Sequence, residues 1–325
     1  GVPIHVSRDV LTKLLRGRMG FNGTVVSDYV GVGWAQTRQR VAETPEDIGA
    51  LALAAGMDVE LPVIYGYGPA LLKAVESGKV SASLVDESAR RVLRDKFALG
   101  LFDNPYVPED PEPIRILARE GDDLSRRLAA ESVTLLKNEN NILPLSRDIR
   151  KVAVIGPHAD RTVVGFPAYT YPAAMQMLLG RISGGESSMA GADASEAFLP
   201  REAKAAMKAE FQDLLNVNLE DYINSSYPAV SLAEPVRRLL PNAEVITVAG
   251  TGVVPSEPAD ISAAVAAVRQ ADVVILYVGG KSAWFGKDRT EGEGQDSANI
   301  DLPSQQVELI NVVTSFGKPT VAVVS

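Results

Sequence analysis

The chain has 325 residues, of which 46% are hydrophobic and 22% are charged, so it is long enough for two domains with cores of ordinary globular composition. The formal net charge of −9 argues against nucleic acid as a partner, because phosphate binding needs clustered Lys and Arg. The absence of cysteine excludes disulfides and Cys-ligated metals, and two histidines are too few for a typical zinc cluster. No apolar run approaches membrane-spanning length, and nothing in the composition selects a compartment.

The first third of the chain alternates strand-like and helix-like segments. Val25 to Asp28 reads as a buried parallel strand that ends in a carboxylate. Ala- and Leu-rich stretches at 51–56 and 69–78 end in glycine, as helices commonly do. A capping pattern at Ser83 and apolar residues at helical period predict a one-sided helix that packs on a core and ends near residue 100. The alternation predicts a β/α series, and because a complete eightfold barrel needs roughly 250 residues, it would supply only about the last two or three units.

A proline-rich segment follows. Residues 104–118 carry four prolines, which predicts neither a helix nor a central strand. We therefore expect a first domain over residues 1–105, a linker over 106–118 and a second domain over 119–325.

The second domain alternates helix-like segments with apolar, β-branched runs. Such runs predict a parallel sheet covered by helices on both faces. The predicted strands are residues 151–156, 244–249, 273–279 and 320–324. Both ends of the chain resemble cut ends of larger domains, so we expect an interior piece of a longer protein.

The local sequence pattern alone allows two interpretations of Asp28. A carboxylate at the end of a buried parallel strand is typical of an active site, because catalytic residues of parallel α/β barrels lie at strand ends. The same residue could instead cap the helix that follows.

Several motifs, found in one order along the chain, resemble those of glycoside hydrolase family 3. The residues concerned are 11–29 (LTKLLRGRMGFNGTVVSDY), 54–62 (AAGMDVELP), 90–93 (RRVL), 100–103 (GLFD), 130–138 (AESVTLLKN), 142–145 (ILPL), 152–157 (VAVIGP), 290–296 (TEGEGQD) and 300–303 (IDLP). The resemblance implies an α/β fold in which the C-terminal part of a (β/α)8 TIM-type barrel precedes an α/β sandwich domain with a mainly parallel sheet.

The resemblance also implies an activity and its site. It implies a retaining, exo-acting β-glycosidase that hydrolyses β-glucosides or, next, β-xylosides without a cofactor. Such an enzyme needs two carboxyl groups about 5 to 5.5 Å apart, one that attacks the anomeric carbon and one that serves as acid and base. The resemblance assigns these roles to Asp28 and Glu293, the latter on a loop whose neighbouring glycines would let it swing toward the sugar.

Other residues compete with or support this pair. Glu291 is the rival acid on the same loop, and Asp58 is a rival near the barrel mouth that we interpret, with Glu60, as structural. Tyr29 is either a ring that stacks on the sugar or a core residue. Trp284, on the glycine-rich loop, is either a pocket wall or a residue of simple packing. Where the family often has Asp-Arg after the acid/base loop, this chain has Asp296-Ser297.

Two further readings belong to other classes of protein. The chain could be a non-catalytic sugar-binding or structural fragment, or one part of a split or permuted glycosidase. A Rossmann-like nucleotide binder has little support, since residues 279–282 lack the earlier glycine of a phosphate loop and residues 152–160 lack two glycines of the dinucleotide fingerprint. We expect a carbohydrate partner, no nucleic acid and no membrane, and open barrel edges would favour self-association.

Overall fold

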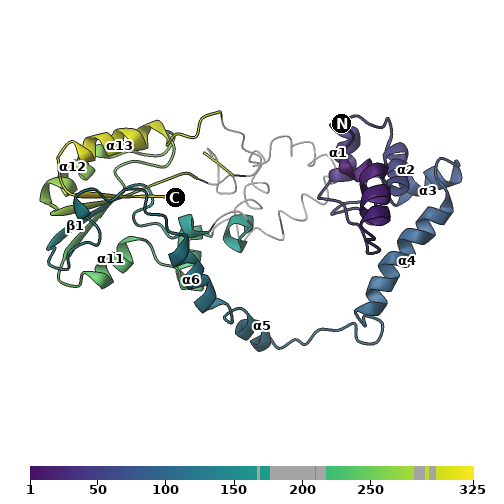
Figure 1. Ribbon diagram of the computed structural model, residues 1–325, viewed down its shortest axis with the longest axis horizontal. Coiled ribbons are helices and arrows are strands. Elements are labelled where there is room, and N and C mark those ends of the chain that lie inside the picture. The colour runs from purple at the N-terminus through teal and green to yellow at the C-terminus, as the bar shows by residue number, and fades with distance from the viewer. Residues whose placement is uncertain (167–168, 176–208, 210–216, 282–289, 293–297) are drawn as a thin grey trace. The chain divides into compact units, whose positions relative to one another are not determined.

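The computed structural model describes residues 1–166, 169–175, 209, 217–281, 290–292 and 298–325. The chain divides into two compact units, Gly1–Val133 and Thr134–Ser325 (Figure 1). Among the helices of the described ranges, none has the length and apolarity needed to span a bilayer.

The first unit is mainly helical. Its described elements are η1 (Ile4–Val6), the wide helix η2 (Asp9–Arg18), α1 (Gly31–Thr37), α2 (Pro45–Ala55), α3 (Pro69–Glu76), α4 (Ala82–Ala98), α5 (Glu112–Leu117) and α6 (Asp122–Ser132).

Helix α2 forms the centre of the first unit's core. Thr44 caps its start by accepting the Asp47 N–H, and Gly56 ends it at a φ of 107°, a left-handed conformation that glycine adopts without strain. The glycine-terminated helices predicted around 51–56 and 69–78 are thus confirmed as α2 and α3. The apolar face of α2, with Ile48 fully buried, packs against residues of η2 and α1.

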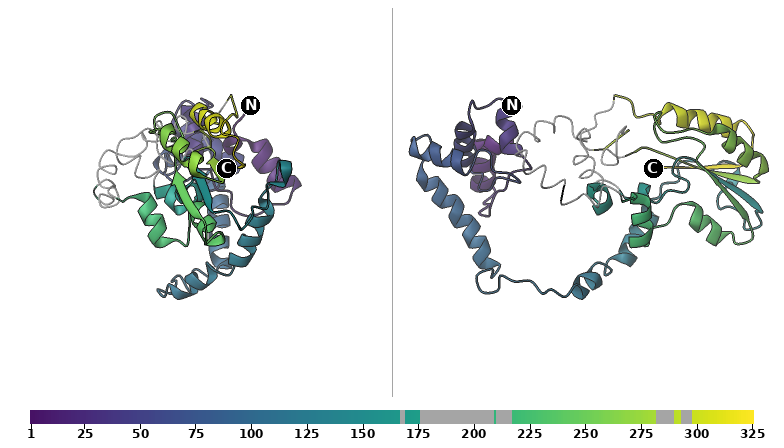
Figure 2. Two further views of the ribbon diagram at one scale, coloured as in Figure 1. Left: turned by 90° about the vertical axis from the view of Figure 1, so that its left-hand side faces the viewer. Right: turned by 180° about the vertical axis from the view of Figure 1, so that it is seen from behind.

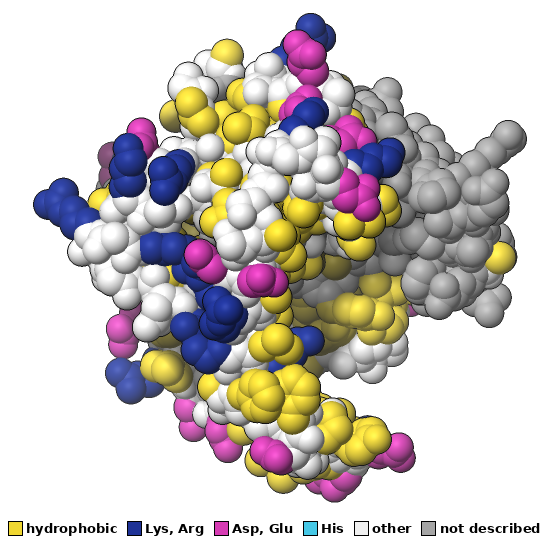
Figure 3. Space-filling view, turned by 90° about the vertical axis from the view of Figure 1, so that its right-hand side faces the viewer, with side chains coloured by type: hydrophobic (Ala, Val, Ile, Leu, Met, Phe, Trp, Pro, Cys, Tyr) yellow, Lys and Arg dark blue, Asp and Glu magenta, His cyan; other side chains and the backbone are white. Residues whose placement is uncertain are grey.

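Helix α4 is confirmed as an element that packs on the core through Leu84, but part of its predicted core face is wrong. Ser81, two residues before the predicted cap, accepts the Ser83 N–H at 3.2 Å. The predicted core residues Leu93 and Phe97 are 45% and 65% exposed. Ser88 is the one buried residue of α4, all of which the structure describes. Figure 3 shows hydrophobic side chains at the surface on the face in view, among Lys and Arg side chains.

The strand predicted from Val25 to Asp28 is reduced to a single parallel bridge between Val26 and Val59. The prediction of a strand buried on both faces is therefore wrong for the described chain, where Val26 is 47% exposed. A parallel strand is stabilised by a hydrogen-bonded neighbour on each side. In the part of the chain that the structure describes, Val26 has one such neighbour.

The proline-rich segment contains a short helix, α5, which corrects the prediction that no helix forms there. Pro113 lies in the first turn of α5, where the missing N–H of proline breaks no intrahelical bond. Residues 101–137 are all exposed, and neither α5 nor α6 has a buried residue. The stretch has the exposure expected of a connecting segment.

The second unit contains a four-stranded parallel sheet of order β2-β1-β3-β4. The strands are β1 (Lys151–Ile155), β2 (Glu244–Val248), β3 (Val273–Val278) and β4 (Thr320–Val324), so all four predicted strands are confirmed. The other described elements are η3 (Glu139–Asn141), η4 (Val163–Gly165), α10 (Leu219–Ser226), α11 (Ala233–Leu239), α12 (Ile261–Gln270) and α13 (Ser304–Thr314).

Helices cover both faces of this sheet (Figures 1 and 2). On one face, side chains of β1 and β3 such as Ile155 and Leu276 pack against α12 and α13. On the other face, Val154 and Ile275 pack against Ala233 and its neighbours in α11. This two-sided burial explains why the strands read as continuous apolar runs.

Candidate active site

Asp28 lies at the end of the short parallel pairing in the first unit. The Ser27 N–H donates to the Val59 carbonyl at 2.8 Å, and the Val30 N–H donates to the Leu61 carbonyl at 2.8 Å. These bonds fix the backbone on both sides of Asp28, while its own side chain is exposed. A carboxylate is thus presented to solvent from an anchored stretch of backbone.

The alternative that Asp28 caps the following helix is wrong. Helix α1 begins at Gly31, its cap residue is Val30, and no side chain makes a capping bond there. The Asp28 carboxylate instead accepts the N–H of the next residue, Tyr29, at 2.7 Å. The side chain is therefore not committed to holding the helix.

Val30 has a left-handed backbone conformation, with φ of 61° and ψ of 6°. This region is unfavourable for a β-branched residue and costs about 1 to 3 kcal/mol when the surroundings enforce it. The surroundings here are the Val30 N–H bond to Leu61 and the Trp34 N–H bond to the Val30 carbonyl at 2.9 Å. Strain of this kind gathers at functional sites, and here it lies two residues after Asp28.

His5 is the neighbour of Asp28 that the sequence patterns did not reveal. Its Nε2 accepts the Asp28 backbone N–H at 3.3 Å, and its ring lies so close to Gly31 that an added Cβ would approach Nε2 to 2.1 Å. Burial lowers the pKa of His5 below its ordinary value, and the Asp28 carboxylate opposes this shift more weakly. A neutral imidazole therefore supports the backbone of Asp28.

The aromatic residues near Asp28 are partly accessible. Tyr29 is 65% exposed, so the alternative that it is a core residue is wrong, and stacking of its ring on the sugar stays a prediction. The Arg38 guanidinium lies over the Trp34 ring at 4.2 Å from its centroid, a cation–π contact that orients the ring.

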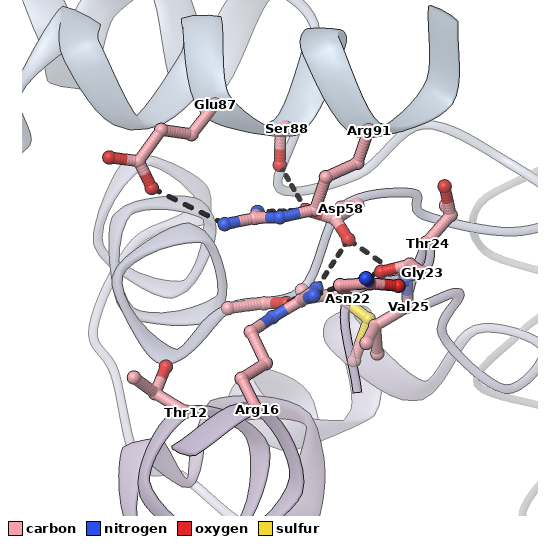
Figure 4. A network of polar contacts seen from close by, with 12 residues as sticks. Thr12, Arg16, Asn22, Gly23, Thr24, Val25, Asp58, Glu87, Ser88 and Arg91 are labelled. Carbon is pink, nitrogen blue, oxygen red and sulfur yellow. Dashed lines mark hydrogen bonds and ion pairs between the residues drawn. The ribbon is translucent and has the colours of Figure 1, made fainter. Parts of the chain in front are cut away.

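Asp58, the rival carboxylate, is committed to a buried polar network (Figure 4). It accepts hydrogen bonds from Arg16 at 2.6 Å, from Arg91 at 2.7 Å, from the Ser88 hydroxyl at 2.6 Å and from the Val25 N–H at 2.9 Å. Two carboxylate oxygens with four donors have little capacity for chemistry. The structural interpretation of Asp58 agrees with these contacts.

Glu60 is likewise a structural acceptor. Its carboxylate accepts the backbone N–H groups of Tyr65 at 3.0 Å, Gly66 at 3.1 Å and Tyr67 at 2.9 Å. These bonds fold the loop between residue 60 and α3 around the buried carboxylate. The carboxylates of Asp58 and Glu60 are thus both engaged in structural hydrogen bonds.

In the second unit, the carboxyl ends of β1 and β3 form the topological switch point of the sheet. The chain leaves β1 toward β2 on one side and leaves β3 toward β4 on the other. Ligand sites of open parallel sheets lie at such points. The ring of His158, just after β1, is buried there against Tyr277 of β3 with centroids 5.5 Å apart. Burial lowers the pKa of His158, while Gly279 at the end of β3 acts in the opposite direction.

The loop that follows β3 carries the predicted acid/base residue. Glu293 and Trp284 lie outside the described residues, so their predicted roles stay predictions. The two ends of the loop are described. The Lys281 N–H donates to the Thr290 hydroxyl at 2.6 Å, and the Thr290 N–H donates to the Lys281 carbonyl at 3.1 Å. These two bonds close the base of the loop at the switch point.

The rival acid, Glu291, directly follows this closed base. Its carboxylate lies over the backbone of Gly280, so closely that a Cβ on that glycine would approach Oε2 to 1.9 Å. The Glu291 side chain therefore points back toward the backbone that follows the carboxyl end of β3. No group of three or more Asp, Glu or His side chains suited to a metal ion occurs among the described residues.

Comparisons with known proteins agree with this arrangement of two units. The profile of the glycosyl hydrolase family 3 N terminal domain matches residues 1–94, and that of the glycosyl hydrolase family 3 C-terminal domain matches residues 133–325. A beta-xylosidase of Formosa agariphila is 28% identical over 332 residues, which cover 99% of this chain and 38% of that protein. A periplasmic beta-glucosidase of Salmonella typhimurium is 29% identical over 334 residues, with the same two coverages of 99% and 38%.

A solved structure gives the same result. The beta-glucosidase from Listeria innocua, crystallised with isofagomine, matches with a TM-score of 0.68 and 25% identity over 98% of this chain and 36% of that chain. The present chain thus spans well under half of these relatives. The C-terminal profile alone covers more than half of the 325 residues, and the chain belongs to glycoside hydrolase family 3.

Proposed function

We propose that this chain supplies both catalytic carboxyl groups of a retaining, exo-acting β-glycosidase. Asp28 is the nucleophile and Glu293 the acid/base, and terminal β-glucosides are the first substrate class to test, with β-xylosides next. Two of the relatives named above are a beta-xylosidase and a beta-glucosidase, which supports both substrate classes.

One observation carries the proposal. Asp28 is an exposed carboxylate on an anchored, strained turn, whereas the neighbouring acids Asp58 and Glu60 are consumed by structural hydrogen bonds. A nucleophile needs one unoccupied oxygen and a fixed backbone. Of the three acids Asp28, Asp58 and Glu60, Asp28 meets both requirements.

The proposed mechanism has two displacements. An Asp28 oxygen attacks the anomeric carbon while protonated Glu293 donates its proton to the departing oxygen, which forms a glycosyl ester on Asp28. Ionised Glu293 then removes a proton from water, and the water oxygen displaces Asp28 to release the sugar. We expect the two carboxyl groups to approach to about 5 to 5.5 Å when the site is assembled.

The finer architecture is part of the same proposal. The parallel bridge at Val26 and Val59, separated by α1 and α2, fits the last units of a (β/α)8 barrel, and the second unit fits an α/β sandwich domain. The predicted boundaries at residues 105 and 118 fall in the exposed stretch 101–137. Limited proteolysis should cut within that stretch first and release two protected fragments.

Trapping of the intermediate tests the function directly. The 2-fluoro group slows both steps, but an activated aryl leaving group speeds the first, so a 2-fluoro β-glucoside with such a group accumulates the ester and a retaining enzyme gains the mass of one fluorosugar. The experiment uses this chain and the longest native polypeptide that contains it. We expect the added mass on the peptide that contains Asp28. A label on another carboxylate would contradict the nucleophile assignment, and complete absence of label in both proteins would favour a non-catalytic fragment.

Self-association is a separate proposal, carried by exposed apolar side chains at the end of α4. Phe97 and Phe102 stack with ring centroids 4.3 Å apart and remain 65% and 54% exposed, and Leu99 beside them is 74% exposed. Apolar patches of this kind favour association. Light scattering should show a mass above that of the monomer, and Phe97→Ser with Leu99→Ser should return it to the monomer value.

A further inference from the structure

Three side chains of the second unit connect the loop after β2 to the base of the loop after β3. Gln306, on the first turn of α13, is fully buried. Its Nε2 donates to the carbonyls of Val253 at 2.9 Å and Gly279 at 2.8 Å, and its Oε1 accepts the Gly279 N–H at 3.0 Å. One amide therefore fixes the residue at which the chain leaves β3.

Glu257 adds a second connection between the same two loops. Its carboxylate accepts the Val253 N–H at 2.9 Å and the Lys281 ammonium at 3.0 Å, and Arg161 lies 3.7 Å away. The side chains of Glu257 and Lys281 are only about one-fifth exposed, at 22% and 21%, so water screens the pair less than a surface pair. Burial acts to raise the pKa of Glu257, but the Val253 N–H and Lys281 outweigh it and hold the pKa below its ordinary value.

The backbone of Lys281 also holds the far end of the loop by hydrogen bonds. Its backbone makes the two hydrogen bonds to Thr290 described above, and its carbonyl also accepts the Glu291 N–H at 3.4 Å. The backbone of Thr290 and Glu291 is therefore fixed by Lys281, which is held from outside the loop by Glu257.

We propose that Gln306, Glu257 and Lys281 form a clamp that positions the acid/base loop for proton transfer. The inference rests on the proposed function for its catalytic consequence, because the loop matters to chemistry only if it carries the acid/base. The three are positioning residues, since none needs to touch the sugar. A carboxyl group that is displaced by as little as about 1 Å loses much of its rate advantage, so the clamp should act on proton transfer more than on sugar binding.

The first measurement needs no activity. Hydrogen exchange in peptides that cover residues 279–281 and 290–292 reports whether the base of the loop opens. We expect Lys281→Met and Glu257→Gln to speed this exchange by about tenfold, because a hydrogen-bonded charge pair is lost. Lys151→Met is the matched control: Lys151 pairs with Glu244 at 2.9 Å at the opposite end of the same sheet and is tied to no loop of the site. Unchanged exchange in both clamp variants would overturn the proposal.

The second measurement is kinetic and uses the longest native polypeptide that shows activity. Aryl β-glycosides with good leaving groups need little protonation, whereas those with poor leaving groups depend on the acid. We expect Lys281→Met to lower kcat/KM about tenfold for poor leaving groups and little for good ones, and azide to restore kcat for good leaving groups because it replaces activated water.

Lys281→Arg should recover most of the lost rate, since it keeps the charge. A uniform loss over all substrates, without azide rescue, would mean a merely structural role and would overturn the positioning inference. If the wild type itself forms no ester at Asp28, the proposed function fails, and the exchange experiment still decides whether the clamp exists.

Discussion

The carboxylate of Asp58 lies 2.6 Å from the guanidinium of Arg16, and its side chain is fully buried while that of Arg16 is 12% exposed. Arg16 also donates to the carbonyls of Gly23 at 2.9 Å and Gly56 at 3.1 Å. The pair thus joins η2, the backbone before the Val26 bridge and the end of α2. It lies at the start of the short parallel pairing, whereas Asp28 lies at its end.

Asp58→Asn should destabilise the first unit strongly. Removing one partner of a buried ion pair leaves the other charge uncompensated, which costs about 3 to 5 kcal/mol. Denaturant unfolding measures the loss. Asp9→Asn is the control, because Asp9 pairs with Lys13 at the same 2.6 Å but is 78% exposed, so its loss should change stability far less than the loss of Asp58. Equal effects of the two substitutions would contradict this account of the network.

Asp28→Ala should behave in the opposite way to Asp58→Asn. The Asp28 side chain is exposed and caps no helix, so the free energy of unfolding should change by less than about 1 kcal/mol. Formation of the covalent glycosyl-enzyme should be abolished, since Asp58 and Glu60, the rival acids of the same strand pairing, are held by structural hydrogen bonds. Retained turnover in the Asp28→Ala protein would remove Asp28 from the mechanism.

Glu293→Ala and Glu291→Ala form a matched pair of substitutions on one loop. We expect Glu293→Ala to reduce turnover of substrates with poor leaving groups by about 100-fold or more, with azide restoring turnover of activated substrates. Glu291→Ala should have a much smaller effect, because the Glu291 carboxylate lies against Gly280. The reverse ranking would transfer the acid/base role to Glu291.

The centre of the second unit's sheet was predictable because its two inner strands, β1 and β3, are buried on both faces. Val273 to Val278 contains only apolar residues and one tyrosine, a pattern typical of a buried parallel strand, and polar or glycine residues mark both of its ends. The end of α2 at Gly56 was predictable for a similarly local reason, because its left-handed conformation favours glycine.

The surroundings of Asp28 were less predictable, because they depend on contacts between distant residues. Val25 and Val26 have strand-forming side chains, but pairing also needs neighbours, and the described chain provides only Val59. His5 reaches the Asp28 backbone across 23 positions of sequence, which no periodicity encodes. The number of prolines alone predicts no helix around Pro113, although proline in a first turn favours a helix.

Val30→Asn tests whether the turn after Asp28 is strained. Asparagine tolerates left-handed backbone better than valine, so relief of strain should stabilise the first unit by up to about 1 kcal/mol. Thermal unfolding measures the change. Val30→Ile keeps the β-branched side chain and should bring no gain. A loss of stability on Val30→Asn would show that packing of the valine side chain outweighs the backbone strain.

The two histidines predict a loss of stability in mild acid. Burial lowers the pKa of both His5 and His158 in the folded protein below the ordinary value of about 6.5. The unfolded chain therefore takes up protons first as the pH falls, and the folded state loses stability from about pH 6.5 down to the folded pKa values, below which this contribution stays constant. Proton NMR of the imidazole C–H resonances should give two titrations with midpoints below about 6.5. Denaturant unfolding should show a slope in this pH range that becomes shallower in His5→Gln, and an equal slope in the variant would mean that His5 does not titrate with folding.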